Sequence, residues 1–484
     1  MEKEIELKLE MTGEAADQIE ASGLLVGDPK ITQQKSIYFD TPDGKLRKAG
    51  LSLRIRHSDG KRIQTVKANR GSAAGLFARS EWEQSVNDDV PILDDSAPIR
   101  ALLGEATDAI TSVFEVRIDR CTWLINESGT SIELVLDRGE AVVCERQSPI
   151  CEIELELKSG APAALFALAR KIDTAAPARL GVLTKAERGH RLTRPLEAVA
   201  KADPVELADH ISTEEAFRTV VNSCIRHFRL NEAIFLEDRN AAALHQSRVA
   251  IRRLRSAFSI FKPMIGNAGA DLREGFRWLS SELGDARNLD VLLERAGPGQ
   301  LRDRIVVARE TAYDRVCDVL ASPRVRLLML DFAEWTAGDT WAGSILGDAD
   351  REQSARKFAI KALNRFRRKV KKAGRDLADA DDGMRHELRK DAKKLRYAAE
   401  FFASLFERKS EQRRYKRFVR ALHSLQDQLG SLNDLVTAPE VLEKLGMTND
   451  VDARELLASG KKKNLLKAAE KTHDKLTDIK RFWK

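Results

Sequence analysis

The chain has 484 residues, of which 43% are hydrophobic and 32% are charged, and its formal net charge is +7. This length allows two or three domains with well-packed cores, and no stretch approaches the ~18 apolar residues that a membrane-spanning helix requires. The N-terminus leads into a predicted strand without the pattern of an export signal, and the five cysteines lack metal-ligand spacing. We therefore expect a reduced, cytoplasmic protein with no membrane partner.

The first predicted strand, residues 4–9, alternates charged with apolar side chains. Successive side chains of a strand point to opposite faces, so Glu4, Glu6 and Lys8 share one face. Such a short alternation is, by itself, most typical of a half-exposed strand. However, further predicted strands at 51–56, 63–68, 80–86, 114–119, 131–137 and 151–158 repeat it. The charged side chains on these later strands include Arg54, Arg56, Lys67, Glu81, Glu83, Glu115, Arg117, Glu133, Asp137, Glu152, Glu154 and Glu156.

Two architectures fit this alternation. An open sandwich leaves its charged face in water, whereas a closed barrel encloses a wet, charged interior and covers its apolar face with helices. The acids gather on the first and last strands and the bases on 51–67, which favours the barrel. Carboxylates bind a hard divalent cation, and guanidinium and ammonium groups bind phosphate oxygens. The pattern therefore indicates a site for a metal-bound polyphosphate.

The segment Glu4-Ile-Glu6-Leu-Lys8 resembles the ExExK signature of the CYTH superfamily, the triphosphate tunnel metalloenzymes. The other matching segments are Tyr38-Phe-Asp-Thr41, residues 51–56, Lys67, Glu81-Trp-Glu83, Arg117, residues 152–156 and Thr184-Lys185-Ala-Glu-Arg188. The resemblance covers residues 1–200. It implies an eight-stranded antiparallel β-barrel tunnel with flanking helices that binds triphosphate substrates with a divalent metal.

We assign roles within this tunnel from the placement of charge. Glu4, Glu6 and Lys8 are the candidate catalytic residues. The candidate ligands of Mg²⁺ or Mn²⁺ are Glu4, Glu6, Glu154 and Glu156. The candidate triphosphate-binding residues are Lys8, Arg54, Arg56, Lys67, Arg117 and Lys185. Glu81, Glu83, Glu133, Asp137 and Glu152 receive no role.

The chemistry expected of these residues is the hydrolysis of inorganic triphosphate to diphosphate and phosphate by a metal-activated water. A thiamine triphosphatase or a class IV adenylyl cyclase is the alternative enzyme. A polyphosphate-binding protein without turnover is the alternative outside catalysis, although pure polyanion binding gains nothing from the glutamates.

The composition changes near residue 200. Residues 1–200 have a net charge of −5 and residues 201–484 a net charge of +12, and strand patterns stop near residue 195. We expect a linker at 201–212 and a helical domain at 213–484, so the chain is an α+β multidomain protein whose second part favours a polyanionic partner.

The helical part contains an internal repeat. The segment starting at His245 recurs at His386, and the segments Leu279–Gly284 and Leu425–Gly430 also correspond. Helical spacing places one basic stripe on each copy, made of His245, Arg248, Arg252 and Arg255 in the first and His386, Arg389, Lys393 and Arg396 in the second. A basic stripe is often only a solvated helix face, where acids four residues away pair with the bases. We expect no such acidic partners in these two stripes, which favours a bound anion. Without interleaved aromatic residues, nucleic acid is not an expected partner.

These repeats, with Arg287-Asn288-Leu-Asp290 and Asn433-Asp434, resemble the CHAD domain, which is often found beside CYTH. The resemblance implies an all-α duplicated helical bundle with pseudo-repeats at about 213–340 and 350–484. It further implies that the two basic stripes form a groove for long-chain inorganic polyphosphate.

Overall fold

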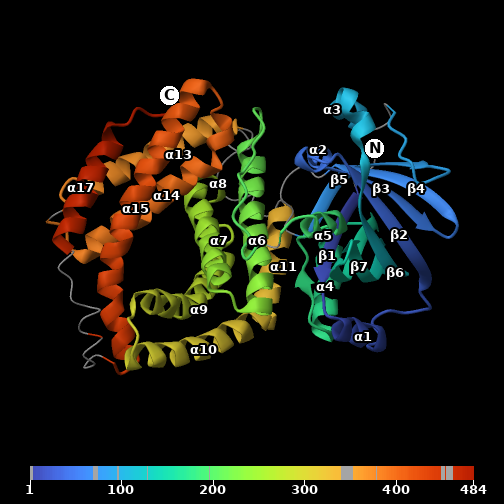
Figure 1. Ribbon diagram of the computed structural model, residues 1–484, viewed down its shortest axis with the longest axis horizontal. Coiled ribbons are helices and arrows are strands. Elements are labelled where there is room, and N and C mark those ends of the chain that lie inside the picture. The colour runs from blue at the N-terminus through green and yellow to red at the C-terminus, as the bar shows by residue number, and fades with distance from the viewer. Residues whose placement is uncertain are drawn as a thin grey trace. The chain divides into compact units, whose positions relative to one another are not determined.

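The computed structural model describes residues 4–68, 75–94, 98–127, 129–195, 197–338, 353–377, 379–447, 453 and 462–484. Its contacts divide the chain into two compact units. One comprises Met1–Ala198 with Ala321–Asp339, and the other comprises Val199–Leu320 with Thr340–Lys484. The first unit is rich in strands and the second is helical (Figure 1).

The first unit contains nine strands: β1 Glu4–Glu10, β2 Lys30–Asp40, β3 Leu51–Ser58, β4 Lys61–Ala68, β5 Leu76–Ser85, β6 Thr111–Glu127, β7 Thr130–Val143, β8 Arg146–Ser159 and β9 Arg179–Leu180. Their order in the sheet is β5-β4-β3-β2-β6-β7-β8-β1-β9, and β1 also pairs with β5. Strands β1 to β8 therefore close into an antiparallel barrel, which confirms the predicted architecture. The two-residue β9 adds to the side of β1.

Strand β1 closes the barrel because it pairs with β5 on one side and with β8 on the other. The first and last long strands are thus direct neighbours, which places the acid-rich face of β1 beside that of β8. Asp59 and Gly60, with φ of 51° and 73°, form the tight turn between β3 and β4 that an Asp-Gly pair favours.

Helices cover the apolar outer face of the barrel. They are α1 Gly13–Ala21, α2 Lys45–Lys48, α3 Ile99–Leu103, the 3₁₀ helix η1 Gly104–Ala109 and α4 Ala163–Ala175. The buried residues of α2 and α3, Leu46 and Ile99, pack with Leu53 and Ile55 of β3. Helix α4 lies against β1 and β8. The apolar side chains that alternate with charge on these strands therefore lie in an ordinary hydrophobic core.

Helix α5, Lys185–Leu192, packs against side chains that point into the barrel at one end. A capping box of Thr184 and Glu187 starts this helix. Its Ala186 and Leu192 pack with Phe114, Val116 and Ile118 of β6. The interior is therefore apolar next to α5 and charged farther along the strands.

This arrangement corrects the assignment of Arg117. Because Phe114, Val116 and Ile118 point inward, the alternating Arg117 points outward. Its side chain is 57% exposed and pairs with Glu115 at 3.2 Å. Arg120, which shares the inward face with these apolar residues, lines the barrel interior instead.

Helix α11, Pro323–Ala337, packs on α4 and β9 although it follows the first helices of the second unit in the chain. Arg170 of α4 bonds to Asp331 at 2.6 Å and to Glu334 at 2.5 Å, and Arg326 of α11 pairs with the buried Asp173. The predicted first repeat, 213–340, included this helix. Its contacts place it with the barrel.

The second unit contains the other helices: α6 Thr213–Asp238, α7 Ala241–Ile260, α8 Lys262–Ile265, α9 Ala270–Arg295, α10 Gln300–Ala321, α13 Ala355–Ala373, α14 Asp382–Phe401, the 3₁₀ helix η2 Ala403–Leu405, α15 Lys409–Lys444 and α17 Lys462–Asp478. None of the helices in the described ranges is both long and apolar enough to cross a bilayer.

The internal repeat appears as two similar helix pairs in this unit. Helix α6 packs on α7, α13 packs on α14, and α7 packs on α14. The residues that cap α6 and α13, Ser212 and Ser354, form an antiparallel bridge with each other. Phe261 stacks on Phe358 with ring centroids 5.0 Å apart and also contacts Phe217 of α6. Equivalent helices thus meet around one aromatic core.

We expect Gly189→Ala to destabilise the packing of α5 in the barrel. A Cβ at Gly189 would lie 2.1 Å from the Phe114 ring. Overpacking typically costs about 1–3 kcal/mol, which exceeds the gain of about 1 kcal/mol from replacing a helical glycine. Thermal unfolding should show a lower midpoint. Gly13→Ala, where a Cβ meets nothing within 4 Å, is the matched control; an equal midpoint in both variants would contradict this packing.

Candidate active site

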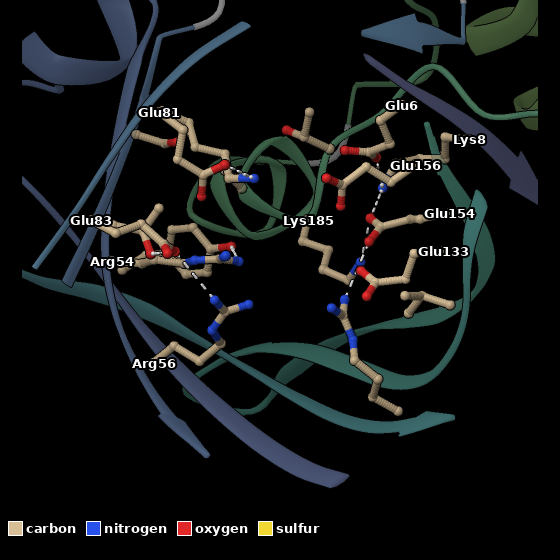
Figure 2. Close-up of a pocket in the computed structure, with 18 of the residues that line it drawn as sticks. Glu6, Lys8, Arg54, Arg56, Glu81, Glu83, Glu133, Glu154, Glu156 and Lys185 are labelled. Atoms are coloured by element: carbon tan, nitrogen blue, oxygen red, sulfur yellow. Dashed lines mark hydrogen bonds and ion pairs between the residues drawn. The ribbon is translucent and has the colours of Figure 1, made fainter. Parts of the chain in front are cut away.

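The barrel encloses a cavity of about 870 Å³ that is lined mainly by charged side chains. The lining cations are Lys8, Arg54, Arg56, Lys67, Arg120, Lys158 and Lys185, and the lining acids are Glu6, Glu81, Glu83, Glu133, Glu154 and Glu156. Figure 2 shows Glu6, Glu133, Glu154 and Glu156 on one side and Arg54, Arg56, Glu81 and Glu83 on the other. The segregation of charge expected from the sequence is present only in part. Glu81 and Glu83 lie beside the arginines, whereas Lys8 and Lys158 lie among the acids, at 2.6 Å from Glu154 and Glu156 respectively.

Most of the predicted site residues meet in this cavity. Glu6, Lys8, Arg54, Arg56, Lys67, Glu154, Glu156 and Lys185 line it. Glu4 lies on β1, but its side chain falls outside the described residues. Arg117 lies on the outer face, as described above.

The register of β1 and β8 sets the acidic side of the cavity. Glu6 lies opposite Glu156, and Lys8 lies opposite Glu154. Side chains of directly opposite residues are neighbours on one face of a sheet. The alternation in the first five residues of β1 therefore matches the alternation in β8 pair by pair.

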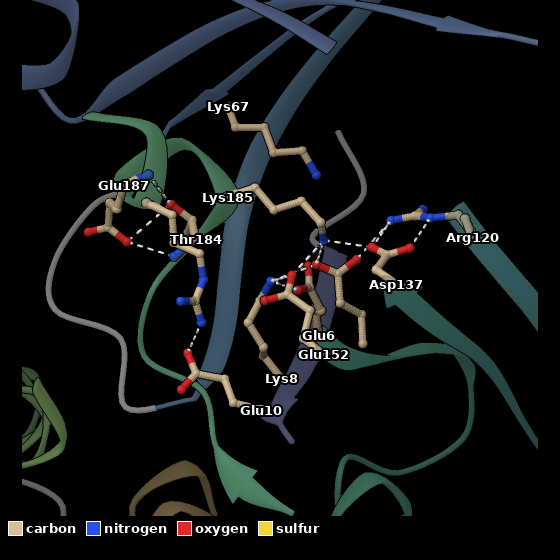
Figure 3. A network of polar contacts seen from close by, with 12 residues as sticks. Glu6, Lys8, Glu10, Lys67, Arg120, Asp137, Glu152, Thr184, Lys185 and Glu187 are labelled. Atoms are coloured by element: carbon tan, nitrogen blue, oxygen red, sulfur yellow. Dashed lines mark hydrogen bonds and ion pairs between the residues drawn. The ribbon is translucent and has the colours of Figure 1, made fainter. Parts of the chain in front are cut away.

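A buried network of ion pairs lies at the inner end of the cavity (Figure 3). The Lys8 Nζ lies 2.7 Å from Glu152 Oε1 and 2.6 Å from Glu154 Oε1. The Lys185 Nζ, from α5, lies 2.6–2.7 Å from oxygens of Asp137, Glu152 and Glu154. Two ammonium groups thus bridge three carboxylates from neighbouring strands.

Arg120 completes this network from β6. It donates two bonds to Asp137, at 2.7 and 2.6 Å, and a third to Glu154 Oε2 at 3.2 Å. Such a bidentate pair fixes the guanidinium in one orientation. The network therefore joins β1, β6, β7, β8 and α5.

The electrostatics of the network favour charged forms throughout. Burial opposes the charge of Lys8, but Glu152 and Glu154 outweigh it and raise the pKa of the ammonium group. For Lys185 and Arg120, burial likewise lowers the pKa, but the charges of Asp137 and the neighbouring glutamates together raise it more, and the pKa of each side chain is raised. Burial would raise the pKa of Glu154, but Lys185 and Lys8 hold it well below its usual range.

The opposite side of the cavity contains crowded guanidinium groups. The charge of Arg54, followed by burial and the charge of Arg120, lowers the pKa of Arg56 to about 10. Arg54 Nε is buried without a hydrogen-bond partner among the described residues. Glu83 Oε1 lies 3.4 Å from Arg56, which offsets part of this repulsion. An anion bound in the cavity would relieve the remaining repulsion between the guanidinium groups.

Glu81, Glu83 and Glu133, which the sequence left without a role, hold neighbouring cations. Glu81 pairs with Lys67 at 2.9 Å, and Glu83 accepts a hydrogen bond from Thr65 at 3.1 Å. Glu133 lies 3.4 Å from Lys158. These contacts position the basic side chains that line the cavity.

The carboxylates fit a divalent cation. Oxygens of Asp137, Glu152 and Glu154 lie within 4.8 Å of one another, which is a ligand spacing, but lysines already occupy part of this cluster. Among the described residues, Glu152 Oε2 is buried without a hydrogen-bond partner. Hard cations take such oxygens as ligands. Glu6 and Glu156 add two carboxylates that line the cavity together with Glu154.

The sequence missed the roles of Arg120, Asp137 and Glu152. Alternation along the strand places Glu152 on the same face as Glu154 and Glu156, and Asp137 on the same face as Glu133. The sequence therefore contained the information that Glu152 and Asp137 point into the barrel. Arg120 shares parity with three apolar residues of β6, and the apolar face was expected to point outward. No local pattern in the sequence shows that α5 fills the barrel at that end.

The second unit contains a basic cluster on α7 and α14. Burial, followed by the charges of Arg252, Arg389, Arg396 and Arg248, lowers the pKa of Lys393 to about 6. Burial, followed by Arg287, Arg252 and Arg248, lowers the pKa of His245 to about 4. We call Arg248, Arg252, Arg389 and Lys393 the α7/α14 cluster.

The repeated Leu-Gly segments of α9 and α15 adjoin the arginines of this cluster. Arg248 donates to the carbonyl oxygens of Leu283 and Gly284, at 2.9 and 2.5 Å. A Cβ at Gly284 would lie 3.4 Å from Arg248, and one at Gly430 would lie 3.5 Å from Arg389. Both are ordinary contact distances, so the repeated Leu-Gly segments lie beside equivalent guanidinium groups in the two halves.

The remaining members of the two predicted stripes have other neighbours. Arg255 experiences the charges of Arg277 and Glu274. Arg396 pairs with Glu400 at 3.1 Å, so the expectation of a stripe without acidic i, i+4 partners was wrong at this position. His386 is exposed, and its Nδ1 lies 3.1 Å from Asn433 Oδ1.

Comparisons with known proteins agree with both units. The family model of the CYTH domain matches residues 2–190, and that of the CHAD domain matches residues 219–443. An inorganic triphosphatase of Haemophilus influenzae is 29% identical over 203 residues, which are 40% of this chain and 55% of that protein. The chain thus spans about half the length of this curated relative.

Solved structures of similar proteins exist for each part. The CHAD domain of Ricinus communis is 28% identical, with a TM-score of 0.49, and the match covers 57% of this chain and 96% of that one. A putative adenylyl cyclase from Hippeastrum, described as having a dominant triphosphatase activity, is 20% identical, with a TM-score of 0.31, over 40% of this chain and 99% of that one. The two family matches show that the chain belongs to the proteins that join a CYTH domain, here residues 2–190, to a CHAD domain, here residues 219–443.

Proposed function

We propose that the barrel hydrolyses inorganic triphosphate to diphosphate and phosphate with the help of a divalent cation. One observation carries this proposal: the guanidinium groups of Arg54, Arg56 and Arg120 crowd one cavity strongly enough to lower the pKa of Arg56. Repulsion of this kind is relieved by a compact, highly charged anion. The similarity to an inorganic triphosphatase supports the same substrate class.

The side chains divide into two groups in this proposal. Arg54, Arg56, Lys67, Arg120 and Lys185 hold the phosphate oxygens, with the network around Lys8 fixing the positions of Lys185 and Arg120. The carboxylates of Glu6, Glu154 and Glu156, with Glu4, hold Mg²⁺ or Mn²⁺. The bound cation would offset phosphate charge and make an attacking water more acidic.

Hydrolysis requires the water oxygen to bond to the terminal phosphorus while the bond to the bridging oxygen breaks. Charge then develops on the leaving diphosphate. Arginines that are already oriented by Asp137 and Glu83 stabilise this charge without further reorganisation. The described lining residues include no cysteine. The lining hydroxyls of Thr65 and Thr184 are hydrogen-bonded to Glu83 and Glu187, at 3.1 Å each, and the nucleophile of this proposal is water.

The cavity favours an inorganic over an organic triphosphate. Tyr38 is the one aromatic side chain among the described residues that line it. This ring stacks on Phe114, with centroids 4.6 Å apart, so that one of its faces is already covered. A nucleobase or thiazolium ring would find little surface for stacking.

The purified protein should release phosphate from tripolyphosphate with Mg²⁺ or Mn²⁺, and a chelator should abolish the release. Glu6→Gln and Glu154→Gln should each lower kcat/KM by about 100-fold or more, because each removes a carboxylate from the metal side. ATP and thiamine triphosphate serve as competing substrates. Pyrophosphate release from ATP would indicate a cyclase, and binding without any turnover would indicate a non-catalytic protein.

Arg120 and Arg117 form a matched pair on one strand with side chains on opposite faces. Arg120→Gln should lower kcat/KM for tripolyphosphate by about 100-fold, because it removes a donor that is fixed toward the cavity. Arg117→Gln should change it by less than about twofold, because it breaks only an exposed ion pair. Similar losses in both variants would refute this placement of the phosphate site. Arg120→Lys tests whether charge alone restores activity.

We further propose that the α7/α14 cluster binds inorganic polyphosphate. The support is again electrostatic, since four cations lie close together and the ammonium of Lys393 has a lowered pKa. A bound polyanion would restore its charge. The match to the CHAD family is consistent with this role.

Polyphosphate binding should be linked to proton uptake by Lys393. In the free protein the pKa of Lys393 is about 6, so its amine is mostly deprotonated at pH 8. A bound polyanion raises the pKa of Lys393. Binding at pH 8 should therefore take up a proton, and affinity should fall as pH rises above 6. Calorimetry in two buffers with different ionisation enthalpies measures this uptake. Lys393→Met should remove it; uptake that persists in this variant would exclude Lys393 as its source.

A further inference from the structure

Helix α13 has a charge composition that the fold does not require. Nine of its 19 residues are Lys or Arg, and none is Asp or Glu. Helix α6 holds the equivalent place in the other repeat, packed on α7 as α13 packs on α14, yet it carries three arginines and five acids. The excess of positive charge on α13 is therefore a property of this helix and not of the architecture.

Four of these cations form a stripe along the outer side of α13: Lys357, Lys361, Arg365 and Arg368. At about 100° and 1.5 Å per residue they lie within about 80° of arc and span about 17 Å. Lys357, Lys361 and Arg368 are exposed, and Arg365 is half-buried. Among the residues that the structure describes, none of the four pairs with a carboxylate. Like charges at this spacing destabilise a helix unless an anion joins them.

A cavity of about 340 Å³ adjoins the stripe, and three of the four cations, Lys361, Arg365 and Arg368, line it. Its other described lining residues are Gln353 and apolar side chains, with no acid. Arg365 donates to the carbonyl oxygen of Ile260 at 2.7 Å, which holds its guanidinium in place. Burial, the one cause acting on it, lowers the pKa of Arg365. Within the described residues, the cavity is therefore lined by positive charge and by no acidic side chain.

The stripe has a defined end. Beyond Arg368, the exposed Lys369 and Lys372 line a different cavity together with Asp376, Asp379 and Asp391. These acids offset the positive charge at the C-terminal end of α13. The stripe therefore ends before the acids at the C-terminal end of α13.

We propose that this stripe is a second contact for inorganic polyphosphate, separate from the α7/α14 cluster. The inference rests on the proposed polyphosphate binding by the second unit. A linear phosphate chain presents charge along a narrow line, as the stripe does. Single-stranded nucleic acid would need exposed aromatic side chains for stacking, whereas Phe366 is buried and Phe358, which lines the cavity, is only 8% exposed. One phosphate of the chain would occupy the cavity beside Arg365.

Binding of a long-chain polyphosphate to the full-length protein at several salt concentrations tests the stripe. Lys361→Gln with Arg368→Gln should weaken binding about tenfold and reduce the slope of log K against log salt by about 1.4, because two phosphate contacts are lost. The matched control is Lys467→Gln with Lys471→Gln, which removes the same charge from exposed positions of α17. Equal effects in both double variants would overturn the proposal.

A third variant, Arg252→Gln with Lys393→Gln, separates this inference from the proposed function. If it weakens binding and the stripe variant does not, the stripe is excluded while the α7/α14 cluster stands. If only the stripe variant weakens binding, the stripe stands and the cluster is excluded. Displacement of the polyphosphate by duplex DNA or single-stranded RNA at equal phosphate concentration would contradict an inorganic ligand.

Discussion

The buried network around Lys8 and Lys185 is the interaction on which the barrel and its cavity both depend. Two ammonium groups and the guanidinium of Arg120 meet Asp137, Glu152 and Glu154 at distances of 2.6–3.2 Å. Buried charges are tolerated only when they are paired, and removing one partner leaves the others uncompensated. The network therefore ties the closing strand β1 and helix α5 to β6, β7 and β8 in one arrangement.

This network also divides the cavity into two electrostatic regions. At the inner end, acids and bases compensate one another, and the acids fix the positions of Lys185 and Arg120. Toward Arg54 and Arg56, positive charge exceeds its local compensation, and the pKa of Arg56 falls. In the helical second unit, burial and the neighbouring arginines similarly lower the pKa of Lys393. In both units, these crowded cations are the basis on which a phosphate-rich ligand is proposed.

The compact units do not follow the chain in simple order. Helix α11 lies between the two helical repeats in the sequence but packs on α4, through Arg326 with Asp173 and Arg170 with Asp331 and Glu334. Because α4 lies against β1 and β8, this helix supports the strands that carry Glu6, Lys8 and Glu154. The barrel unit thus includes a segment more than 100 residues beyond its last strand.

The sequence by itself determined the features that depend on local periodicity. Alternation placed Glu6, Lys8, Arg54, Arg56, Glu154 and Glu156 on inward faces, and helical spacing with repetition located the α7/α14 cluster. Tertiary structure decided which face of β6 points inward, because α5 fills that end of the barrel and draws Phe114, Val116 and Ile118 toward it. Arg120 therefore replaces Arg117 in the cavity. Tertiary structure also decided that Asp137 and Glu152 pair with Lys185. A contact between a strand and a helix that lie 30 to 50 residues apart produces no periodic pattern in the sequence.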